Sequence, residues 1–453
     1  MTHDMTRGSL LPILIKFTIP LVLGNLLQLT YNAADSIIVG RFVGASALAA
    51  VGTSNPLVTL IILFEQGICL GTGVLIGMLF GSHQYDRLQR QVSTGMVSGL
   101  VFSLGMAALT IVLAPSLLTI LQVDSAILDE AVLYLRIVAF GLLFNFIYNY
   151  FAGTLRAMGD SRSPLLFLAL SAALNVAGDL IFVIIFHMGV VGCAVATVLS
   201  EGLSGILCFI YIQRRIPMLQ LGKRWLLFDA SLLRLTLQYG FVSAMQQCAV
   251  QVGKLGIQGI VNTMGVASTA AFSAVNRVDD YAVVVEQNIA HAMTSVMAQN
   301  EGAGEHKRVF RAFEYGLVLE LVYGVLAGIL FYFLAEPIMH LFTQDAEVVT
   351  IGRTYLQLIA FMYILPGLTN GIQGYFRGIG DLKVTLFSSM LNMGVRVIAA
   401  IPMVFVFHMG MEAIPWSYML GWIAMIAFEL PFFLRWNRDH LMRQVAEESE
   451  DQK

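Results

Sequence analysis

Four polar residues stand inside apolar segments and could together bind a cation. Asn175 and Asp179 lie four residues apart in the run SAALNVAGDLIFV, which places them one turn apart on the same face of a helix. Asp35 and Thr197 stand in two other apolar segments. Two carboxylates, an amide oxygen and a hydroxyl form an all-oxygen ligand set, which suits a proton or a hard cation such as sodium. The alternative is a structural hydrogen-bond network that carries no ion.

The composition places these residues in a membrane. Of 453 residues, 57% are hydrophobic and only 12% are charged, whereas soluble domains have about 25% charged residues. Apolar runs long enough to cross a bilayer, about 20 residues each, recur along the chain, and they predict helices because barrel strands would alternate. We therefore predict an all-α integral membrane protein with about twelve transmembrane helices. The predicted spans are residues 14–40, 46–80, 92–119, 127–154, 163–186, 190–212, 234–261, 267–299, 312–341, 348–375, 384–407 and 412–435.

The four polar residues should lie at similar depth, in the outer half of the membrane. Lys and Arg gather in the loops after even-numbered spans, while Arg41 alone follows an odd-numbered span, so both termini should be cytoplasmic. With a rise of ~1.5 Å per residue, Asp35 and Asp179 lie about 30 Å and 24 Å from the cytoplasmic ends of their spans. Thr197 lies about 10 Å from the outer end of its span. Ionised carboxylates there are costly unless they are paired, protonated or coordinated.

The sequence contains an internal repeat. RAMGD at Arg156–Asp160 recurs as RGIGD at Arg377–Asp381, an offset of 381 − 160 = 221, and FHMG recurs with the same offset. An even number of spans per copy puts both copies the same way up in the membrane. We expect the Gly and Asp of the shared motif to serve turns. The predicted domains are an N-terminal six-helix lobe (1–213), a cytoplasmic linker (214–234), a C-terminal six-helix lobe (235–436) and a polar cytoplasmic tail (437–453).

The second copy lacks the acidic groups of the first. With the offset of 221, the position equivalent to Asn175 holds Arg396, and the position equivalent to Asp179 holds Ala400. Arg396 and Lys254 either neutralise nearby acidic residues or contact an anionic substrate group or a lipid. Glu65 and Glu286 occupy equivalent places in the two copies, where they either serve helix packing or line a cavity that attracts cations. The candidates for cavity or substrate contacts are Glu65, Lys254, Glu286 and Arg396.

The chain resembles the multidrug and toxic compound extrusion (MATE) transporters. The resemblance rests on the duplicated six-span unit, YNAADSIIVGRFVGASALAAVG in the first span, RAMGD, and LNVAGD in the fifth span, and it covers about residues 10 to 435. It implies a V-shaped transporter whose two parallel six-helix lobes export amphiphilic, mostly cationic compounds in exchange for protons or sodium. The cation site of prokaryotic members matches Asp35, Asn175, Asp179 and Thr197, and their bending proline matches Pro20. Because the second lobe offers Lys254 and Arg396, the site resembles that of DinF-like members.

We therefore expect an antiporter working by alternating access in the cytoplasmic membrane of a prokaryote. Its partners should be small amphiphilic drugs or toxins and the lipid bilayer, with no nucleic acid, and we expect a monomer. No cofactor is expected, only the coupling ion, H⁺ or Na⁺. The absence of HExxH, GxSxG and paired His motifs argues against an enzyme. The alternative function is a lipid-linked oligosaccharide or precursor flippase of the same superfamily, which Lys254 and Arg396 favour and the two aspartates oppose.

Overall fold

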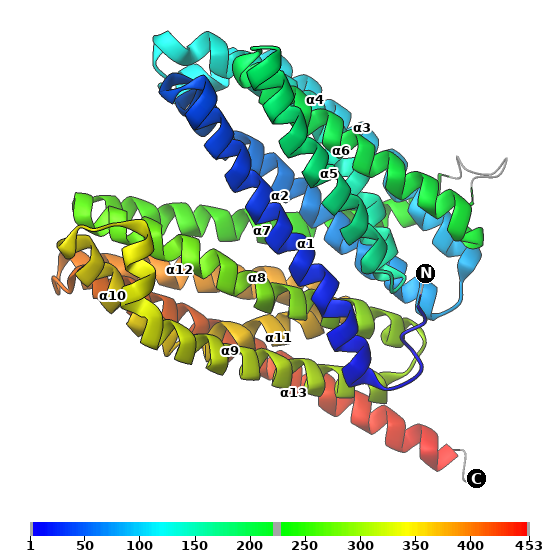
Figure 1. Cartoon of the computed structure of the whole chain (residues 1–453). Coiled ribbons are helices and arrows are strands. Elements are labelled where there is room, and N and C mark those ends of the chain that lie inside the picture. The colour runs from blue at the N-terminus through cyan, green and yellow to red at the C-terminus, as the bar shows by residue number, and fades with distance from the viewer. Residues whose placement is uncertain (1–2, 221–227, 451–453) are drawn as a thin grey trace. The chain divides into compact units, whose positions relative to one another are not determined.

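The computed structural model describes residues 3–220 and 228–450, and these residues form helices and no strand. The predicted linker therefore lies partly outside the described residues, as do the last three residues of the predicted tail. Figure 1 shows the helices in chain order. The first half contains α1 (Leu10–Ile38), η1 (Val39–Val43), α2 (Ala45–Gly81), α3 (Tyr85–Ile120), α4 (Ser125–Ala157), α5 (Arg162–Leu180), η2 (Ile181–Ile185), α6 (Gly189–Arg215) and η3 (Pro217–Leu219). The second half contains α7 (Ala230–Asn262), α8 (Val266–Gly302), α9 (His306–Phe342), α10 (Ala346–Ala360), α11 (Ile364–Gly378), α12 (Leu382–Phe405), η4 (Gly410–Glu412) and α13 (Ala413–Glu450).

The chain is a multi-pass membrane protein whose helices coincide with the predicted apolar segments. Each segment falls on one long helix or on two helices in direct succession. Within the described residues, nine helices are long and apolar enough to cross a membrane, or ten with the bent pair α10 and α11. The two remaining segments form α7 and α8, which have 33 and 37 residues, more than the roughly 20 that a bilayer requires. They are more polar, because α7 carries five glutamines and α8 carries Arg277, Asp279, Asp280 and Glu286.

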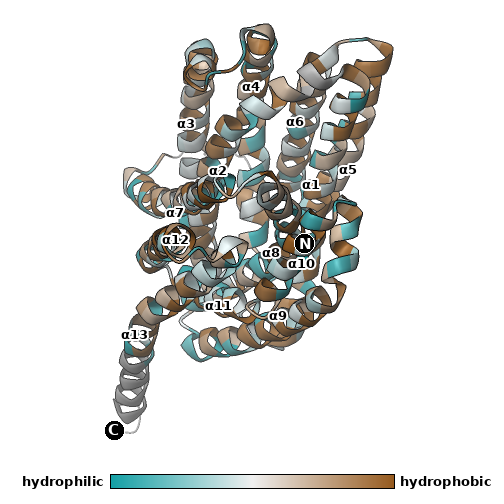
Figure 2. Ribbon diagram, turned by 90° about the vertical axis from the view of Figure 1, so that its left-hand side faces the viewer, coloured by the Kyte–Doolittle hydropathy of each residue, from teal (hydrophilic) through white to brown (hydrophobic). Residues whose placement is uncertain are grey.

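The outer faces of the helices are apolar, as expected for contact with lipid. On α3, Val101, Leu104 and Val112 are between 60% and 72% exposed. Figure 2 shows hydrophobic residues along most turns of the helices. A water-soluble protein would cover such helices with polar side chains, so these faces fit a hydrocarbon surrounding.

The predicted span 348–375 is broken in its middle. α10 and α11 meet at an angle of 50° around Phe361–Tyr363. Pro366 lies shortly after the break, where it lacks the N–H that would bond to the carbonyl of Met362 and its ring crowds that carbonyl. The freed Met362 carbonyl instead accepts the N–H of Leu365, three residues on, at 2.8 Å. The proline therefore explains why one apolar segment forms two helices.

The repeated motifs RAMGD and RGIGD form equivalent turns after α4 and α11. Gly159 and Gly380 have φ angles of 84° and 82°, a left-handed conformation that glycine adopts without steric cost. Asp160 follows the first of these glycines and accepts hydrogen bonds from the N–H (3.0 Å) and hydroxyl (2.8 Å) of Ser163. These contacts start α5, and so they fix the direction of the helix that carries Asn175 and Asp179.

The chain divides into two compact units. Unit 1 contains the residues up to Gly8 and Ile15–Gln247, and unit 2 contains Ser9–Leu14 and the residues from Cys248 onward. The division falls inside α7, C-terminal to the predicted linker. Within unit 1, the first half of α7 packs closely on α2, because Gly67 and Gly71 lie against the backbone of Ala244 and Tyr239. A side chain at either glycine would collide with that backbone, so the close approach requires glycine.

Candidate functional site

The four residues predicted to form the cation site all belong to unit 1. Asp35 lies near the end of α1, Asn175 and Asp179 lie on α5, and Thr197 lies on α6. α5 and α6 approach closely because Gly178 faces Ala196. This approach lets the Asn175 Nδ2 donate a hydrogen bond of 3.3 Å to the Thr197 Oγ1.

Asp35 and Asp179 are side-chain neighbours, so the negative charge of the two carboxylates must be neutralised. Their carboxyl groups interact directly, and Asp179 is fully buried. Asp35 Oδ1 and both oxygens of Asp179 are buried and accept no hydrogen bond from a nitrogen or oxygen of the described chain. Two adjacent carboxylates without donors repel each other and lose hydration, so a proton or a cation must accompany them.

The amide oxygen of Asn175 joins this group of buried oxygens that accept no hydrogen bond from a nitrogen or oxygen of the described residues. Asn175 Oδ1 is also buried and lacks a hydrogen-bond partner within the described residues, because the amide nitrogen is the atom that faces Thr197. Oxygens that face no donor are what a proton or a hard cation would satisfy. In the part of the chain that the structure describes, no three His, Cys, Asp or Glu side chains converge as a metal centre. A set of oxygen ligands suits a proton or a hard cation better than a transition metal.

Two π-helical segments adjoin this site. η1 starts four residues after Asp35, and η2 starts two residues after Asp179. The two segments contact each other, and Val39 of η1 packs in one apolar cluster with Val183 of η2. Single π-helical turns often mark functional positions in helices, and these two fix the ends of α1 and α5 relative to each other.

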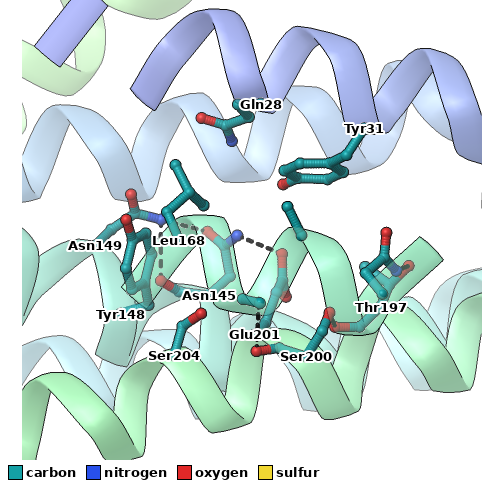
Figure 3. A pocket seen from close by; sticks show the side chains of 13 residues that line it. Gln28, Tyr31, Asn145, Tyr148, Asn149, Leu168, Thr197, Ser200, Glu201 and Ser204 are labelled. Carbon is teal, nitrogen blue, oxygen red and sulfur yellow. Dashed lines mark hydrogen bonds between the residues drawn. The ribbon is translucent and has the colours of Figure 1, made fainter. Parts of the chain in front are cut away.

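A small polar cavity lies beside the site, and the sequence interpretation did not identify it. Its volume is about 20 Å³, enough for at least one water molecule. Figure 3 shows Asn145 of α4 and Glu201 of α6 linked by a hydrogen bond at the cavity, with Gln28 and Tyr31 of α1 on the opposite side. Asn145 Nδ2 donates to Glu201 Oε1 at 2.7 Å. Asn175 and Thr197 also line the cavity, so it shares a wall with the cation site.

One sequence signal could have identified Glu201. It stands four residues after Thr197 in the run AVATVLSEGLSGILCF, so it lies on the same helix face. An ionisable residue within a transmembrane segment indicates function by default. Asn145 carries no such signal, because its side chain is not ionisable.

The other candidates of unit 1 occupy different places. Glu65 of α2 is fully buried, and its Oε1 accepts a hydrogen bond of 2.6 Å from the Ser103 hydroxyl of α3. This contact joins two helices, while the second carboxyl oxygen of Glu65 is buried without a partner in the described residues. Pro20 lies inside α1, fifteen residues before Asp35.

In unit 2, two predicted candidates carry opposite charges and have separate partners. Lys254 forms an ion pair of 3.7 Å with Asp280, and both side chains are more than half exposed. Glu286 is fully buried on α8 and faces the Asn370 amide at 3.5 Å. Asp279 and Glu320 are acidic electrostatic neighbours of Glu286.

Arg396 contacts aromatic rings, and Asp279 is an acidic electrostatic neighbour. Its guanidinium carbon lies 4.3 Å from the ring centre of Tyr418 and 4.6 Å from that of Trp422. Its Nε donates a hydrogen bond of 2.8 Å to Asn392 Oδ1, and the residue is only 8% exposed. Cation–π contacts of this kind stabilise a buried guanidinium.

Unit 2 also buries charged residues that the sequence interpretation did not identify as site candidates. Glu320 of α9 and Glu429 of α13 are fully buried, and Arg377 of α11 is 6% exposed. Arg377 attracts both glutamates electrostatically. Each of the three stands in or next to an apolar run. A search of the apolar segments for ionisable residues, the signal that applies to Glu201, would therefore have found them.

Ionisable side chains buried within two repeated sets of membrane helices are typical of membrane transporters. A family model, MatE, matches residues 20–181 and 243–401. The chain belongs to the MatE family, which confirms the resemblance found in the sequence, and it is a membrane transporter rather than an enzyme.

Individual proteins agree with this assignment. "Probable multidrug resistance protein YpnP" of Bacillus subtilis is 28% identical over 391 residues, covering 86% of this chain and 87% of its own. "Probable multidrug resistance protein NorM" of Thermotoga maritima is 25% identical and covers 94% and 93%. A crystal structure described as MATE in the bent conformation matches the fold with a TM-score of 0.91 at 22% identity, over 98% of both chains. These matches support the two-lobe, all-helical fold.

Proposed function

We propose that this protein is a secondary active antiporter that exports amphiphilic, mostly cationic compounds in exchange for protons or sodium ions. It would act by alternating access, as a monomer, in the cytoplasmic membrane of a prokaryotic cell with both termini in the cytoplasm. The names of the relatives from Bacillus subtilis and Thermotoga maritima, both probable multidrug resistance proteins, support this class of substrate.

One observation carries the proposal: Asp35 and Asp179 are neighbours, and three of their four carboxyl oxygens are buried and accept no hydrogen bond from a nitrogen or oxygen of the described residues. In the proposed mechanism, a bound proton or sodium ion neutralises the pair and lets α1 pack against α5. Loss of the ion leaves carboxylates that must be hydrated, which favours a state in which α1 moves away. Pro20 would provide the bend, because it removes one backbone hydrogen bond of α1.

Antiport requires only that the ion and the substrate favour different states. A ligand shifts a two-state equilibrium by its difference in affinity for the two states. A difference of ~5 kcal/mol is enough to convert a 1:99 population to 99:1. Neutralising two buried carboxylates supplies an energy of this order.

The contacts of Lys254 and Arg396 weaken the flippase alternative. The two residues favoured it as cations for an anionic lipid group. Lys254 pairs with Asp280, and the Arg396 guanidinium lies against Tyr418 and Trp422. We therefore propose efflux alone.

Transport in liposomes tests the proposal. Purified protein is reconstituted and presented with a panel of cationic dyes and drugs, while a proton gradient and a sodium gradient are imposed in separate experiments. We expect at least one of the two gradients to drive uphill movement of dye, with protein-free liposomes as the control. Movement that only follows the dye gradient, whichever ion gradient is imposed, would contradict antiport.

A further inference from the structure

Unit 2 contains two carboxyl groups that are buried without hydrogen-bond donors. Glu320 of α9 and Glu429 of α13 have no exposed surface, and none of their carboxyl oxygens accepts a hydrogen bond from a nitrogen or oxygen of the described residues. Arg377 of α11 attracts both of them electrostatically. Its Nε donates a hydrogen bond of 3.2 Å to the carbonyl oxygen of Gln373. The guanidinium thus lowers the cost of negative charge here without bonding to either carboxyl group.

The internal repeat indicates that the fold does not require these two carboxyl groups. With the offset of 221, the positions equivalent to Glu320 and Glu429 hold Gly99 and Cys208 in unit 1. The arginine of the repeated motif is present in both copies, and Arg156 of unit 1 is an electrostatic neighbour of Cys208. The same arrangement of helices around an arginine therefore exists in unit 1 without acidic side chains at these two positions.

The place of the Glu320 side chain is filled by an aromatic ring in unit 1. A Cβ atom at Gly99 would overlap the ring of Phe146. The position equivalent to Phe146 holds Gly367, where a Cβ atom would lie 3.1 Å from the carbonyl oxygen of Glu320. An apolar ring in one copy thus corresponds to a carboxyl group in the other. Because apolar groups fill a buried place at lower cost than charges do, the carboxyl group indicates a role beyond packing.

The charges around the arginine do not balance without a proton. One guanidinium compensates one carboxylate, and the second carboxylate would remain buried and uncompensated. Glu286 of α8 is a further acidic neighbour of Glu320, so it adds to the imbalance. Glu429 has uncharged polar neighbours, Ser388 of α12 and Gln373 of α11. A buried carboxyl group in such surroundings takes up a proton rather than remain ionised.

We propose that Glu320 and Glu429 form a second proton-binding site, which holds one shared proton beside the Arg377 guanidinium. A proton, unlike a metal ion, requires neither a cavity nor several ligands. Arg377 lies in the last turn of α11, so the site can exchange its proton with water near the end of this helix. The inference goes beyond the proposed function, because the proposed coupling site belongs to unit 1.

Infrared spectroscopy of the purified protein tests the proposal. Protonated carboxyl groups absorb separately from carboxylates, at a C=O stretch that shifts in D₂O. The spectrum of each variant at neutral pH is subtracted from that of wild type, so that unchanged groups such as Glu286 cancel. We expect Glu320→Gln and Glu429→Gln each to lose the intensity of one protonated carboxyl group. The losses should be equal, because the guanidinium compensates whichever carboxylate remains.

The equivalent arginines of the two copies provide a matched pair of variants. Arg377→Gln removes the compensating charge, so both glutamates should be protonated and the band should gain the intensity of one carboxyl group. Arg156→Gln makes the same change in unit 1, where the equivalent positions hold no carboxyl group, and should leave the band unchanged. Glu429→Cys introduces the residue that unit 1 has at this position, and it repeats the test if the glutamine variants do not fold.

The outcomes separate a shared proton from a purely structural charge cluster. Equal losses in the two glutamate variants, together with a gain in Arg377→Gln, would support the proposal. A band that persists at full intensity in either glutamate variant would overturn it, and so would an unchanged band in Arg377→Gln. The measurement requires no transport, so a failure of antiport in liposomes would refute the proposed function and leave this site standing.

Discussion

The Asp35 and Asp179 carboxyl groups interact directly across the contact between α1 and α5, and Asp179 has no exposed surface. Such a pair is stable only with a proton or a cation, because three of its four oxygens are buried and accept no hydrogen bond from a nitrogen or oxygen of the described chain. The relationship therefore ties the charge of the site to the position of α1.

Replacing either aspartate should uncouple the protein. We expect Asp35→Asn and Asp179→Asn each to abolish gradient-driven export, because an amide cannot exchange a proton and binds a cation weakly. Folding should persist, since the amide keeps the volume of the carboxyl group. Export is measured in liposomes that contain equal amounts of each variant, with elution volume as the check on folding. Export by Asp179→Asn at a near wild-type rate would refute the assignment.

Replacing the neutral ligands of the cation site should reduce export less than replacing its carboxylates. Asn175→Ala and Thr197→Ala each remove one uncharged ligand and the 3.3 Å hydrogen bond between them, so we expect a severalfold decrease in export rather than its loss. A neutral hydrogen bond contributes about 1 kcal/mol, which agrees with an effect of this size. The same liposome assay compares initial rates. If Thr197→Ala were as inactive as Asp179→Asn, the hydroxyl would be more than a neutral ligand.

Arg396 should stabilise unit 2. Arg396→Gln removes two cation–π contacts and a 2.8 Å hydrogen bond in a buried place, so we expect a loss on the order of 2 kcal/mol or more. Lys254→Gln is the matched control, because its ion pair is more than half exposed and is worth at most about 1 kcal/mol. A thiol-reactive dye reports unfolding, since Cys69, Cys193 and Cys208 are buried. Equal melting temperatures of the two variants would show that the cluster around Arg396 is not stabilising.

Asp160 should make stability depend on pH at acidic values. Burial tends to raise the pKa of its carboxyl group, but hydrogen bonds from Ser163 and Tyr211 outweigh this effect and hold the pKa below the usual 3.8. A lowered folded-state pKa contributes stability that is present above the unfolded pKa and is lost as pH falls through the folded pKa. Asp160→Asn should therefore melt at a lower temperature than wild type at neutral pH, and the difference should shrink below about pH 4.

The second repeat provides the control for Asp160. Asp381 is its equivalent, but Val384 and Phe432 replace Ser163 and Tyr211, and neither side chain can donate a hydrogen bond. We expect Asp381→Asn to change the melting temperature less. A difference between Asp160→Asn and wild type that stays constant down to pH 3 would show that the carboxylate charge is unimportant.

Local patterns in the sequence predicted most of the helices and placed Asn175 and Asp179 on one helix face. Apolar runs in a membrane must form helices, and the spacing of Asn175 and Asp179 determines their common face. The offset of 221 predicted equivalent turns at Gly159 and Gly380, because a left-handed turn requires glycine in both copies.

Features that depend on contacts between distant helices could not be predicted in this way. The cavity at Glu201 requires the approach of α1, α4, α5 and α6, and no single segment encodes it. The stacking of Arg396 on Tyr418 and Trp422 likewise joins α12 to α13. The break at Phe361–Tyr363 was in principle visible from Pro366, but prolines also occur inside continuous membrane helices, such as Pro20 in α1.

Release of the coupling ion on substrate binding tests the central claim most directly. Purified protein in weakly buffered detergent is loaded with protons, or with radioactive sodium in a parallel sample, and a transported dye is added. We predict that wild type and Glu286→Gln, a matched change at a buried carboxyl group, release the ion, and that Asp179→Asn does not. Release by Asp179→Asn equal to wild type, or a loss in Glu286→Gln as large as that in Asp179→Asn, would contradict a coupling site formed by Asp35 and Asp179.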